Sequence, residues 1–304
     1  MNGAEPVQDA ARPIEVFEAL RPQLTGLAYR MTGALTEAED IVQDAWLRWQ
    51  RTDAGAVEVP KAFLFRIVTR LCIDRARSAR LRREVYVGPW LPEPVADAGW
   101  PGAPAGPDAA AERADDLSVA LLLVLERLSP LERAAFLLHD VFDLPFAEIA
   151  TTLERTPAAC RKLASRARGR VREARPGGAL GPASIAAFAA RFHEAVRTGD
   201  VATLAASLAE DAVLISDGGG KAYAALNPIR GRDHILRFLI GLVRKFGPPR
   251  EVRRMRLNGG EGFLIVEADG TVQTWSLDFG ARGEVTAIYA MRNPDKLGGV
   301  RGMA

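Results

Sequence analysis

The stretch FAEIATTLERTPAACRKLASRARGRVR, residues 146–172, carries the strongest local signal in the chain. Its first part predicts a short helix that ends near Leu153, and Thr156 with Pro157 predicts the start of a second helix. Threonine is a good N-cap because its hydroxyl accepts a hydrogen bond from a first-turn amide, and proline already has the φ that the first helical position needs. A short helix, a tight turn and a second helix together predict a helix-turn-helix unit.

The second helix of this unit is predicted to have an apolar face and a basic face. Small side chains on the apolar face would let another helix cross closely: Cys160, Leu163, Ala164, Ala167 and Val171. The remaining faces carry the candidate DNA-binding side chains Arg161, Lys162, Ser165, Arg166 and Arg168. Such side chains can contact phosphates and guanine edges in the major groove. The alternative is a solvated basic face on a packed helix pair, and the order of short helix, tight turn and basic helix favours DNA binding over it.

The charge of the chain is balanced overall but unevenly distributed. The 304 residues carry 40 Lys and Arg against 38 Asp and Glu, a formal net charge of +2. Residues 61–83 hold eight basic side chains against Asp74 alone, and residues 155–175 hold eight against Glu173 alone. Local basic patches can bind polyanions even when the net charge is close to zero, so two segments are candidates for contact with nucleic acid.

Composition argues against several other classes of protein. With 48% hydrophobic and 26% charged residues the chain has the composition of a globular protein, and its length predicts two or three domains. Cys72 and Cys160 lie far apart in helical patterns and are expected to be buried hydrophobes. The three histidines show no metal-ligand spacing, so neither a metal site nor a cofactor is expected. Without a signal-peptide pattern or an apolar run of membrane-spanning length, we expect a cytoplasmic protein with no membrane contact.

Hydrophobic periodicity divides the chain into helical and mixed parts. Residues 14–49, 60–83 and 113–174 predict helices, with Thr36 and Glu39 as a capping box within the first range. Two amphipathic helices and then four antiparallel strands are predicted further on, at 183–197, 231–246, 251–257, 262–267, 271–279 and 284–291. The expected fold is therefore multidomain, with two all-α modules followed by an α+β domain.

Three further stretches resemble one family of bacterial proteins. AEDIVQDAWL (38–47), KAFLFRIVTRLCIDRAR (61–77) and LSPLERAAFL (128–137) resemble regions 2.2, 2.4 and 4.1 of the extracytoplasmic-function RNA polymerase sigma factors, group IV of the sigma-70 family. The helix-turn-helix then corresponds to region 4.2, and order and spacing agree over residues 12–175. The helix-turn-helix alone would also fit a repressor; the N-terminal stretches favour a sigma factor.

The resemblance implies partners and site residues by position. Core RNA polymerase, through its β′ clamp helices and β flap, and promoter DNA would be the partners. The residues implied in polymerase binding are Glu39, Asp40, Asp44 and Trp46. The −10 element would be held by Lys61, Arg66, Arg70, Arg75 and Arg77, and helix 157–172 would read the −35 element. Many relatives have Asn where this chain has Arg70, which puts contacts near that position in doubt. Core packing is the alternative role for Trp46, Phe63 and Phe65.

A proline-rich segment connects the two helical modules. It contains YVGPWLPEP (86–94), with Trp90, Leu91 and Pro92 as candidate docking residues, because prolines stiffen a segment and lower the entropy cost of docking. The alternative is a merely stiff spacer. The segment resembles the linker of sigma factors that carry a C-terminal SnoaL-like domain. Two further motifs match that subgroup and are candidate regulatory contacts: Asp217, Gly218, Gly219, Gly220 and Lys221, and then Asn293, Pro294 and Asp295.

The resemblance implies that the C-terminal domain is an α+β cone around a pocket, which is a candidate site for a small-molecule or peptide ligand. The three glycines permit positive φ, and Asp217 and Lys221 are expected to pair as charged partners across a tight turn. An enzyme is not expected. Acid–base groups are available, but nothing in the sequence arranges them: His193, His234, Asp278 and Tyr289.

The predicted domains are region 2 (12–85), the linker (86–112), region 4 (113–176) and the SnoaL-like domain (182–298). The leading hypothesis is an alternative sigma factor that its C-terminal domain regulates in cis. The alternatives are a ligand-responsive helix-turn-helix regulator that binds DNA without polymerase, and an enzyme that uses the pocket.

Overall fold

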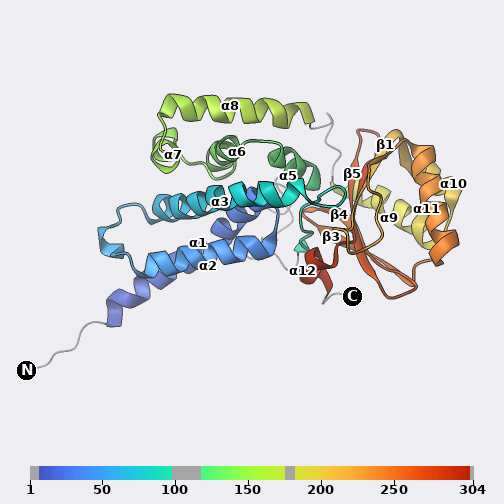
Figure 1. Cartoon of the computed structure of the whole chain (residues 1–304), viewed down its shortest axis with the longest axis horizontal. Coiled ribbons are helices and arrows are strands. Elements are labelled where there is room, and N and C mark those ends of the chain that lie inside the picture. Colours follow the sequence, from blue (N-terminus) through green and yellow to red (C-terminus); the bar gives the residue numbers. More distant parts are fainter. Residues whose placement is uncertain (1–6, 98–117, 175–181, 302–304) are drawn as a thin grey trace, which may run out of the picture. The chain divides into compact units, whose positions relative to one another are not determined.

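The computed structural model describes the backbone of residues 7–97, 118–174 and 182–301, and side chains within 13–76, 85–97, 118–173 and 185–300. The chain forms two compact units (Figure 1). The helical unit contains Met1–Leu81 and Val124–Arg172. The second unit contains Arg82–Leu123 and Glu173–Ala304, so the described linker residues 86–97 belong with the C-terminal domain. The expected fold class, two all-α modules and an α+β domain, is confirmed.

The helical unit is built from long N-terminal helices and a shorter set that follows the linker. Its first helices are α1 (Val7–Thr32), α2 (Leu35–Gln50) and α3 (Pro60–Glu84), with a 3₁₀ turn η1 (Ala54–Ala56). The second set is α5 (Val119–Glu126), whose residues up to Leu123 belong to the second unit, then α6 (Pro130–Phe136), a π-helical turn η3 (Leu137–Val141), α7 (Phe146–Leu153) and α8 (Pro157–Ala174). The predicted helix-turn-helix is α7 and α8, and Thr156 caps α8 by accepting from the amide of Ala159 at 3.2 Å.

The predicted capping box at Thr36 and Glu39 is wrong. Gly33 has φ +75° and ends α1 sharply, and α2 begins at Leu35 with Ala34 as its N-cap and no side-chain cap. The hydroxyl of Thr32 accepts from the Ala34 amide at 3.3 Å instead. Because the turn between the helices is so short, the second helix begins at Leu35, so Thr36 is already inside it and cannot be its N-cap.

The two helical sets pack on each other through a buried arginine and an aromatic side chain. Arg133 of α6 is buried and donates from Nη1 to the carbonyl of Met31 at 2.5 Å. Burial lowers the pKa of this guanidinium to about 10, which still leaves it charged at neutral pH. Phe142 lies edge-on to Phe65 of α3 at 5.1 Å between ring centroids, under the guanidinium of Arg30 at 5.6 Å. Phe65 is fully buried, so the packing alternative holds for that residue.

The C-terminal domain is one twisted sheet with helices on one face. The strand order is β2-β1-β6-β5-β4-β3, and only the β1–β6 pair is parallel among the described strands. The strands are β1 (Leu208–Asp217), β2 (Ile229–Arg230), β3 (Glu251–Leu257), β4 (Gly260–Val266), β5 (Val272–Phe279) and β6 (Val285–Met291). Figure 1 shows α9 (Pro182–Thr198), α10 (Val201–Ser207) and α11 (Arg232–Phe246) on one side of the sheet.

Alternating side chains divide this sheet between two apolar clusters. Phe263 and Trp275 face the helices, and Phe263 stacks on Phe192 of α9 with centroids 5.9 Å apart. Leu264 and Tyr289 face the opposite side. There they pack with the linker and with the C-terminal turns η4 (Pro294–Lys296) and α12 (Gly298–Arg301). A strand has a side-chain period of two, so one sheet supports both a domain core and a docking face.

The four predicted strands and two predicted helices of this domain agree with the structure to within two residues. β1, β2 and α10 were not predicted. The first half of β1 reads LAEDA, which has neither strict alternation nor β-branched residues, and its pairing with β6 is a long-range contact. None of the described helices has both the length and the apolar character needed to cross a membrane.

Removing the Phe263 ring should destabilise the C-terminal domain. Phe263 is fully buried, so Phe263→Ala is expected to cost about 3–5 kcal/mol in the free energy of unfolding, from lost transfer energy and an unfilled cavity. Val201→Ala, at a position 43% exposed on α10, should cost about 0.5 kcal/mol or less. Amide hydrogen exchange of β4 and β5 would measure both, and equal effects of the two variants would contradict this account of the core.

Candidate functional site

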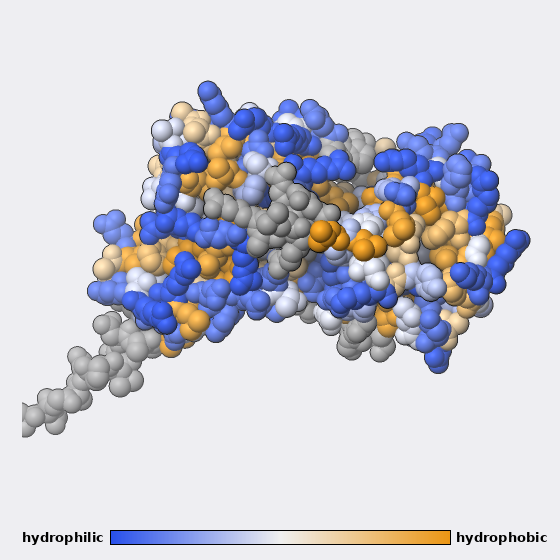
Figure 2. All heavy atoms as spheres, viewed as in Figure 1, coloured by the Kyte–Doolittle hydropathy of each residue, from blue (hydrophilic) through white to orange (hydrophobic). Residues whose placement is uncertain are grey.

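The basic face of α8 is presented as the sequence predicted. The predicted apolar residues Cys160, Ala164, Ala167 and Val171 are buried, and Leu163 is partly buried. Among the candidate DNA-binding residues, Arg161, Lys162, Ser165 and Arg166 are exposed and Arg168 is half-buried. At about 100° per residue these five positions fall within one arc of the helix, opposite the buried arc. Hydrophilic side chains line the edge of the helical unit where α8 runs (Figure 2).

Two arginines of this face are held by carboxylates of the same unit. Arg166 lies 3.2 Å from Glu132, and Arg168 lies 2.6 Å from Asp140. Glu132 also closes the capping box of α6 with Ser129, which restricts its rotamer. Arg161 lies over the ring of Phe146 at 5.9 Å. The basic face is therefore oriented by its neighbours before any phosphate is bound.

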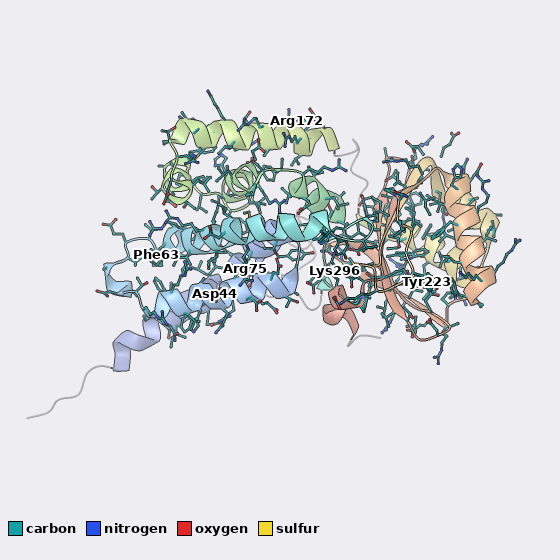
Figure 3. The ribbon with its side chains drawn as sticks, viewed as in Figure 1. Asp44, Phe63, Arg75, Arg172, Tyr223 and Lys296 are labelled. Atoms are coloured by element: carbon teal, nitrogen blue, oxygen red, sulfur yellow. The ribbon has the colours of Figure 1, made fainter. Side chains whose placement is uncertain are left out.

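The candidate residues on α3 do not form one surface. Arg75 turns toward α2 and pairs with Asp44 at 3.3 Å and Asp40 at 3.7 Å; Figure 3 shows Asp44 and Arg75 on facing helices. Arg70 pairs with Glu154 at 2.8 Å and donates to the carbonyl of Thr152. The other two described candidates lie along aromatic rings, Lys61 over Phe65 at 5.6 Å and Arg66 over Phe63 at 5.0 Å. The side chain of Arg77 lies outside the described residues.

The polymerase-binding candidates on α2 also divide into two groups. Asp40 and Asp44 lie one turn apart, and both contact Arg75. Glu39 is exposed. Trp46 packs instead on Phe17 of α1, with ring centroids 4.9 Å apart. The structure therefore gathers the two aspartates and gives Trp46 a packing contact.

The linker is anchored by a buried carboxylate at the end of β1. Asp217 is fully buried, and its two oxygens accept from Tyr86 Oη at 2.6 Å and from the Leu91 amide at 2.9 Å. The ammonium of Lys296 completes the shell at 2.7 Å from the carboxylate. Burying a carboxylate costs several kcal/mol unless it is paired and hydrogen-bonded, so these partners are needed for Asp217 to be stable there.

Lys296 also holds the linker from its other side. Its Nζ donates to the carbonyl of Leu91 at 2.7 Å and lies 4.4 Å from the ring centroid of Trp90 and 4.8 Å from that of Tyr86. Asn293 donates to Tyr86 Oη at 2.8 Å. Burial and the hydrogen bond to Asp217 raise the pKa of Tyr86, so its hydroxyl remains a donor. The ammonium stays in place because a carboxylate, a carbonyl and two ring faces surround it.

The glycine loop corrects one prediction. Asp217 and Lys221 do not pair with each other: Asp217 pairs with Lys296, and Lys221 pairs with Asp295. Gly219 and Gly220 both have positive φ, at +59° and +72°, which turns Lys221 away from the buried carboxylate. A Cβ on Gly219 would overlap the side chain of Asn293, so the close approach requires glycine there. The buried Gly218 accepts from the Lys221 amide at 2.9 Å.

A second anchor follows a few residues later in the linker. Leu91 and Pro92 are buried, and Ala96 forms an isolated bridge to Leu257 of β3. Asn258 exchanges hydrogen bonds with the backbone of Val95. Residues 86–97 therefore lie along the sheet face opposite the helices.

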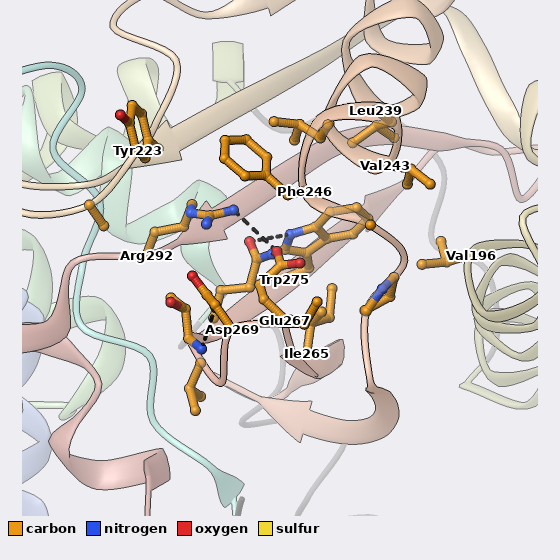
Figure 4. Close-up of a pocket in the computed structure, with 18 of the residues that line it drawn as sticks. Val196, Tyr223, Leu239, Val243, Phe246, Ile265, Glu267, Asp269, Trp275 and Arg292 are labelled. Atoms are coloured by element: carbon orange, nitrogen blue, oxygen red, sulfur yellow. Dashed lines mark hydrogen bonds and ion pairs between the residues drawn. The ribbon is translucent and has the colours of Figure 1, made fainter.

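The helix side of the sheet contains a cavity of about 890 Å³. Trp275, Phe246, Leu239 and Ile265 contribute apolar walls, and Arg292 and Glu267 contribute charge (Figure 4). The four acid–base candidates do not converge there. His193 and His234 each contact a backbone carbonyl, and burial raises the pKa of Asp278, which accepts from Tyr289 at 2.8 Å on the other face of the sheet.

Sequence reasoning missed two important anchor residues, Tyr86 and Lys296. Tyr86 is the first residue of the motif YVGPWLPEP, and Lys296 directly follows the motif Asn293, Pro294 and Asp295. A buried aspartate needs a cation and a hydrogen-bond donor beside it. An expectation that Asp217 is buried would therefore have indicated Lys296 and Tyr86.

Comparisons with known proteins give the family. The model of sigma-70 region 2 matches residues 16–82, and that of sigma-70 region 4 matches residues 118–171. The ECF RNA polymerase sigma factor SigJ of Mycobacterium tuberculosis is 41% identical over 297 residues, which cover 94% of this chain and 93% of that protein. The probable ECF sigma factor SigI of the same species is 37% identical over 67% of each chain. The crystal structure of M. tuberculosis SigJ matches 95% of this chain and 99% of its own, at 38% identity and a TM-score of 0.77.

The chain belongs to the extracytoplasmic-function sigma factors of RNA polymerase, and within them it is similar to SigJ across both the helical modules and the C-terminal domain. The sigma factor hypothesis is confirmed, and the C-terminal domain has the α+β fold that the resemblance implied. A helix-turn-helix regulator that acts without polymerase is not favoured. The family is not an enzyme family.

Removing the Asp217 carboxylate should release the linker. Asp217→Ala leaves the ammonium of Lys296 and the Leu91 amide without their buried acceptor, which is expected to cost about 3–5 kcal/mol. Asp211→Ala, at an exposed position on the same strand, is the matched control. Hydrogen exchange at the amides of residues 86–97 should speed up only in the first variant; an unchanged Leu91 amide would rule out this anchor.

Proposed function

We propose that the chain binds core RNA polymerase and directs initiation at one class of promoters, with its C-terminal domain as a built-in regulator. Membership of the sigma factor family supports the interaction with polymerase and promoter DNA. The observation that carries the regulatory part is the buried anchor, in which Asp217 and Lys296 hold the linker. Regions 2 and 4 must both reach the promoter. A domain that binds the linker between them would therefore be able to control their access to it.

The −35 element would be read by α8, whose exposed basic face matches what a recognition helix presents to the major groove. The −10 element would be held by α3. Arg70 and Arg75 engage Glu154, Asp40 and Asp44 in this structure, and we propose that phosphates replace these carboxylates when the promoter binds. Exposed ion pairs are worth about 1 kcal/mol or less, so such an exchange costs little.

The regulatory role rests on how both ends of the connection are held. Tyr86 and Leu91 at the start of the linker contact Asp217 at the end of β1, and Val119, in the helix that follows the linker, belongs to the same buried cluster as Leu91. Residues 86–97, held by these contacts, have lost most of the freedom that a flexible linker would have. We propose that release of this segment changes promoter output, and that the cavity is the place where a signal molecule acts.

The DNA-reading role of α8 predicts a salt dependence. In the full-length chain with core polymerase, the double variant Arg161→Ala, Lys162→Ala should lower run-off transcription at least tenfold. The slope of log promoter affinity against log salt should fall by about two, because two phosphate contacts are lost. Core binding should not change, and Arg237→Ala on α11 is the control. A full salt slope in the double variant would exclude these contacts.

The linker role predicts that Trp90→Ala changes promoter output in either direction by several-fold. Loss of the Trp90 ring removes a cation–π contact worth about 1 kcal/mol from the Lys296 anchor. Val85→Ala, directly before this segment at a position 80% exposed, should leave output unchanged. Run-off transcription from the upstream region of the protein's own gene measures both variants. The docking role fails if Trp90→Ala gives the same output as the parent.

A further inference from the structure

The C-terminal cavity combines an apolar interior with one polar cluster. Its walls include Trp275, Phe246 and Leu239, and its volume of about 890 Å³ is within the range of small-molecule sites in proteins. Tyr223 at its rim is 76% exposed, and Phe246 is 43% exposed. Aromatic surface left open at the rim of a large cavity is typical of a site that an apolar molecule covers.

The polar cluster leaves one donor without an acceptor. Trp275 Nε1 donates to Gln273 at 3.0 Å, Gln273 donates to Glu267, and Arg292 pairs with Glu267 at 3.3 Å. Nε of Arg292 is buried and has no hydrogen-bond partner among the described residues. Figure 4 shows the guanidinium group among the residues that line the cavity. A buried donor without a partner costs about 1–3 kcal/mol. Arg292 lines the cavity, so a shift of its side chain that brought Nε to an acceptor oxygen of a bound molecule would remove that cost.

The charges that line the cavity restrict the ligand further. Glu267 balances Arg292, and Asp295 balances Lys221 at the rim. Asp269 accepts from the Thr271 amide, which holds its carboxylate in the adjoining turn. Arg244 also lines the cavity, is exposed and has no ion pair among the described residues. One such arginine is not the cluster of cations that a polyanion would need. The lining suits a largely apolar molecule with a single carbonyl or carboxylate oxygen.

The cavity shares its wall with the linker anchor. Gly220, Lys221 and Pro294 line the cavity. The loops that contain these residues also contact the linker. Gly220 lies against Val87, since a Cβ added at Gly220 would be 3.3 Å from the Val87 side chain, and Asn293 donates to Tyr86. The amides of Arg292 and Asn293 both donate to the carbonyl of Asp217. Within residues 292–296, Arg292 and Pro294 line the cavity, whereas Asn293 and Lys296 contact the linker.

We propose that this cavity binds an amphipathic organic molecule, with an aromatic or aliphatic body against Trp275 and Phe246 and one carbonyl or carboxylate oxygen on Arg292, and that its occupancy strengthens the grip on linker residues 86–91. A ligand against Lys221 and Pro294 orders the two loops that the linker also needs ordered. Each binding event then lowers the entropy cost of the other, so the coupling is positive. The proposal rests on the proposed regulatory function.

The ligand class is tested with 2-naphthoic acid and naphthalene as probes, titrated into the full-length chain by NMR or calorimetry. Both should bind, the acid at least tenfold more tightly. Arg292→Gln should remove that preference and leave naphthalene binding unchanged. Val243→Trp, at a cavity-lining position 48% exposed on α11, should block both probes without disturbing the core. No binding of either probe, or equal binding of the acid to all three proteins, would overturn the ligand class.

The coupling is tested with the same acid and the Trp90→Ala variant. Coupling is reciprocal, so loosening the linker should weaken binding of 2-naphthoic acid by about fivefold. The acid should also slow amide exchange at residues 86–91 in the parent chain. If Trp90→Ala changes transcription but binds the acid as the parent does, the coupling is wrong and the regulatory function stands. If the acid binds with the expected coupling while transcription is unchanged, the regulatory function is the part that fails.

Discussion

The buried carboxylate of Asp217 is the constraint on which the C-terminal unit depends. A carboxylate with no solvent contact must be supplied with donors, and here they come from two separate stretches of the chain: Tyr86 and Leu91 in the linker and Lys296 after the last strand. The linker therefore does not lie on the sheet through apolar contact alone. It satisfies a charge that would otherwise destabilise the domain, which makes its docking geometrically specific.

The sheet serves two functions because its side chains alternate between faces. One face closes the core and the cavity with α9, α10 and α11, and the other holds the linker and the C-terminal turns. The loops at residues 217–222 and 292–296 lie at the ends of the parallel pair β1 and β6, where both faces can be reached. A change in either loop would alter contacts on both faces, which would give the proposed regulatory role of this domain a physical basis.

In the helical unit, several charged side chains pair with one another. Residues proposed to contact DNA or polymerase pair with carboxylates of the same unit: Arg75 with Asp40 and Asp44, and Arg70 with Glu154. These pairs are exposed enough to be weak and exchangeable, whereas Arg133, which ties α6 to the end of α1, is buried. The helical unit thus combines a buried contact, from Arg133 to the end of α1, with several exposed and weaker ion pairs.

The sequence by itself determined the helix-turn-helix, the basic arc of α8, four strands and the motifs that form the anchor, because these depend on local periodicity, capping and turn chemistry. It did not determine β1, whose partner β6 is about 75 residues away along the chain. It also paired Asp217 with Lys221, the nearest cation in the sequence, whereas folding brings Lys296 to the carboxylate. Only the tertiary structure decided these, because the energy of a buried charge depends on which groups meet in space, and sequence distance carries no information about that.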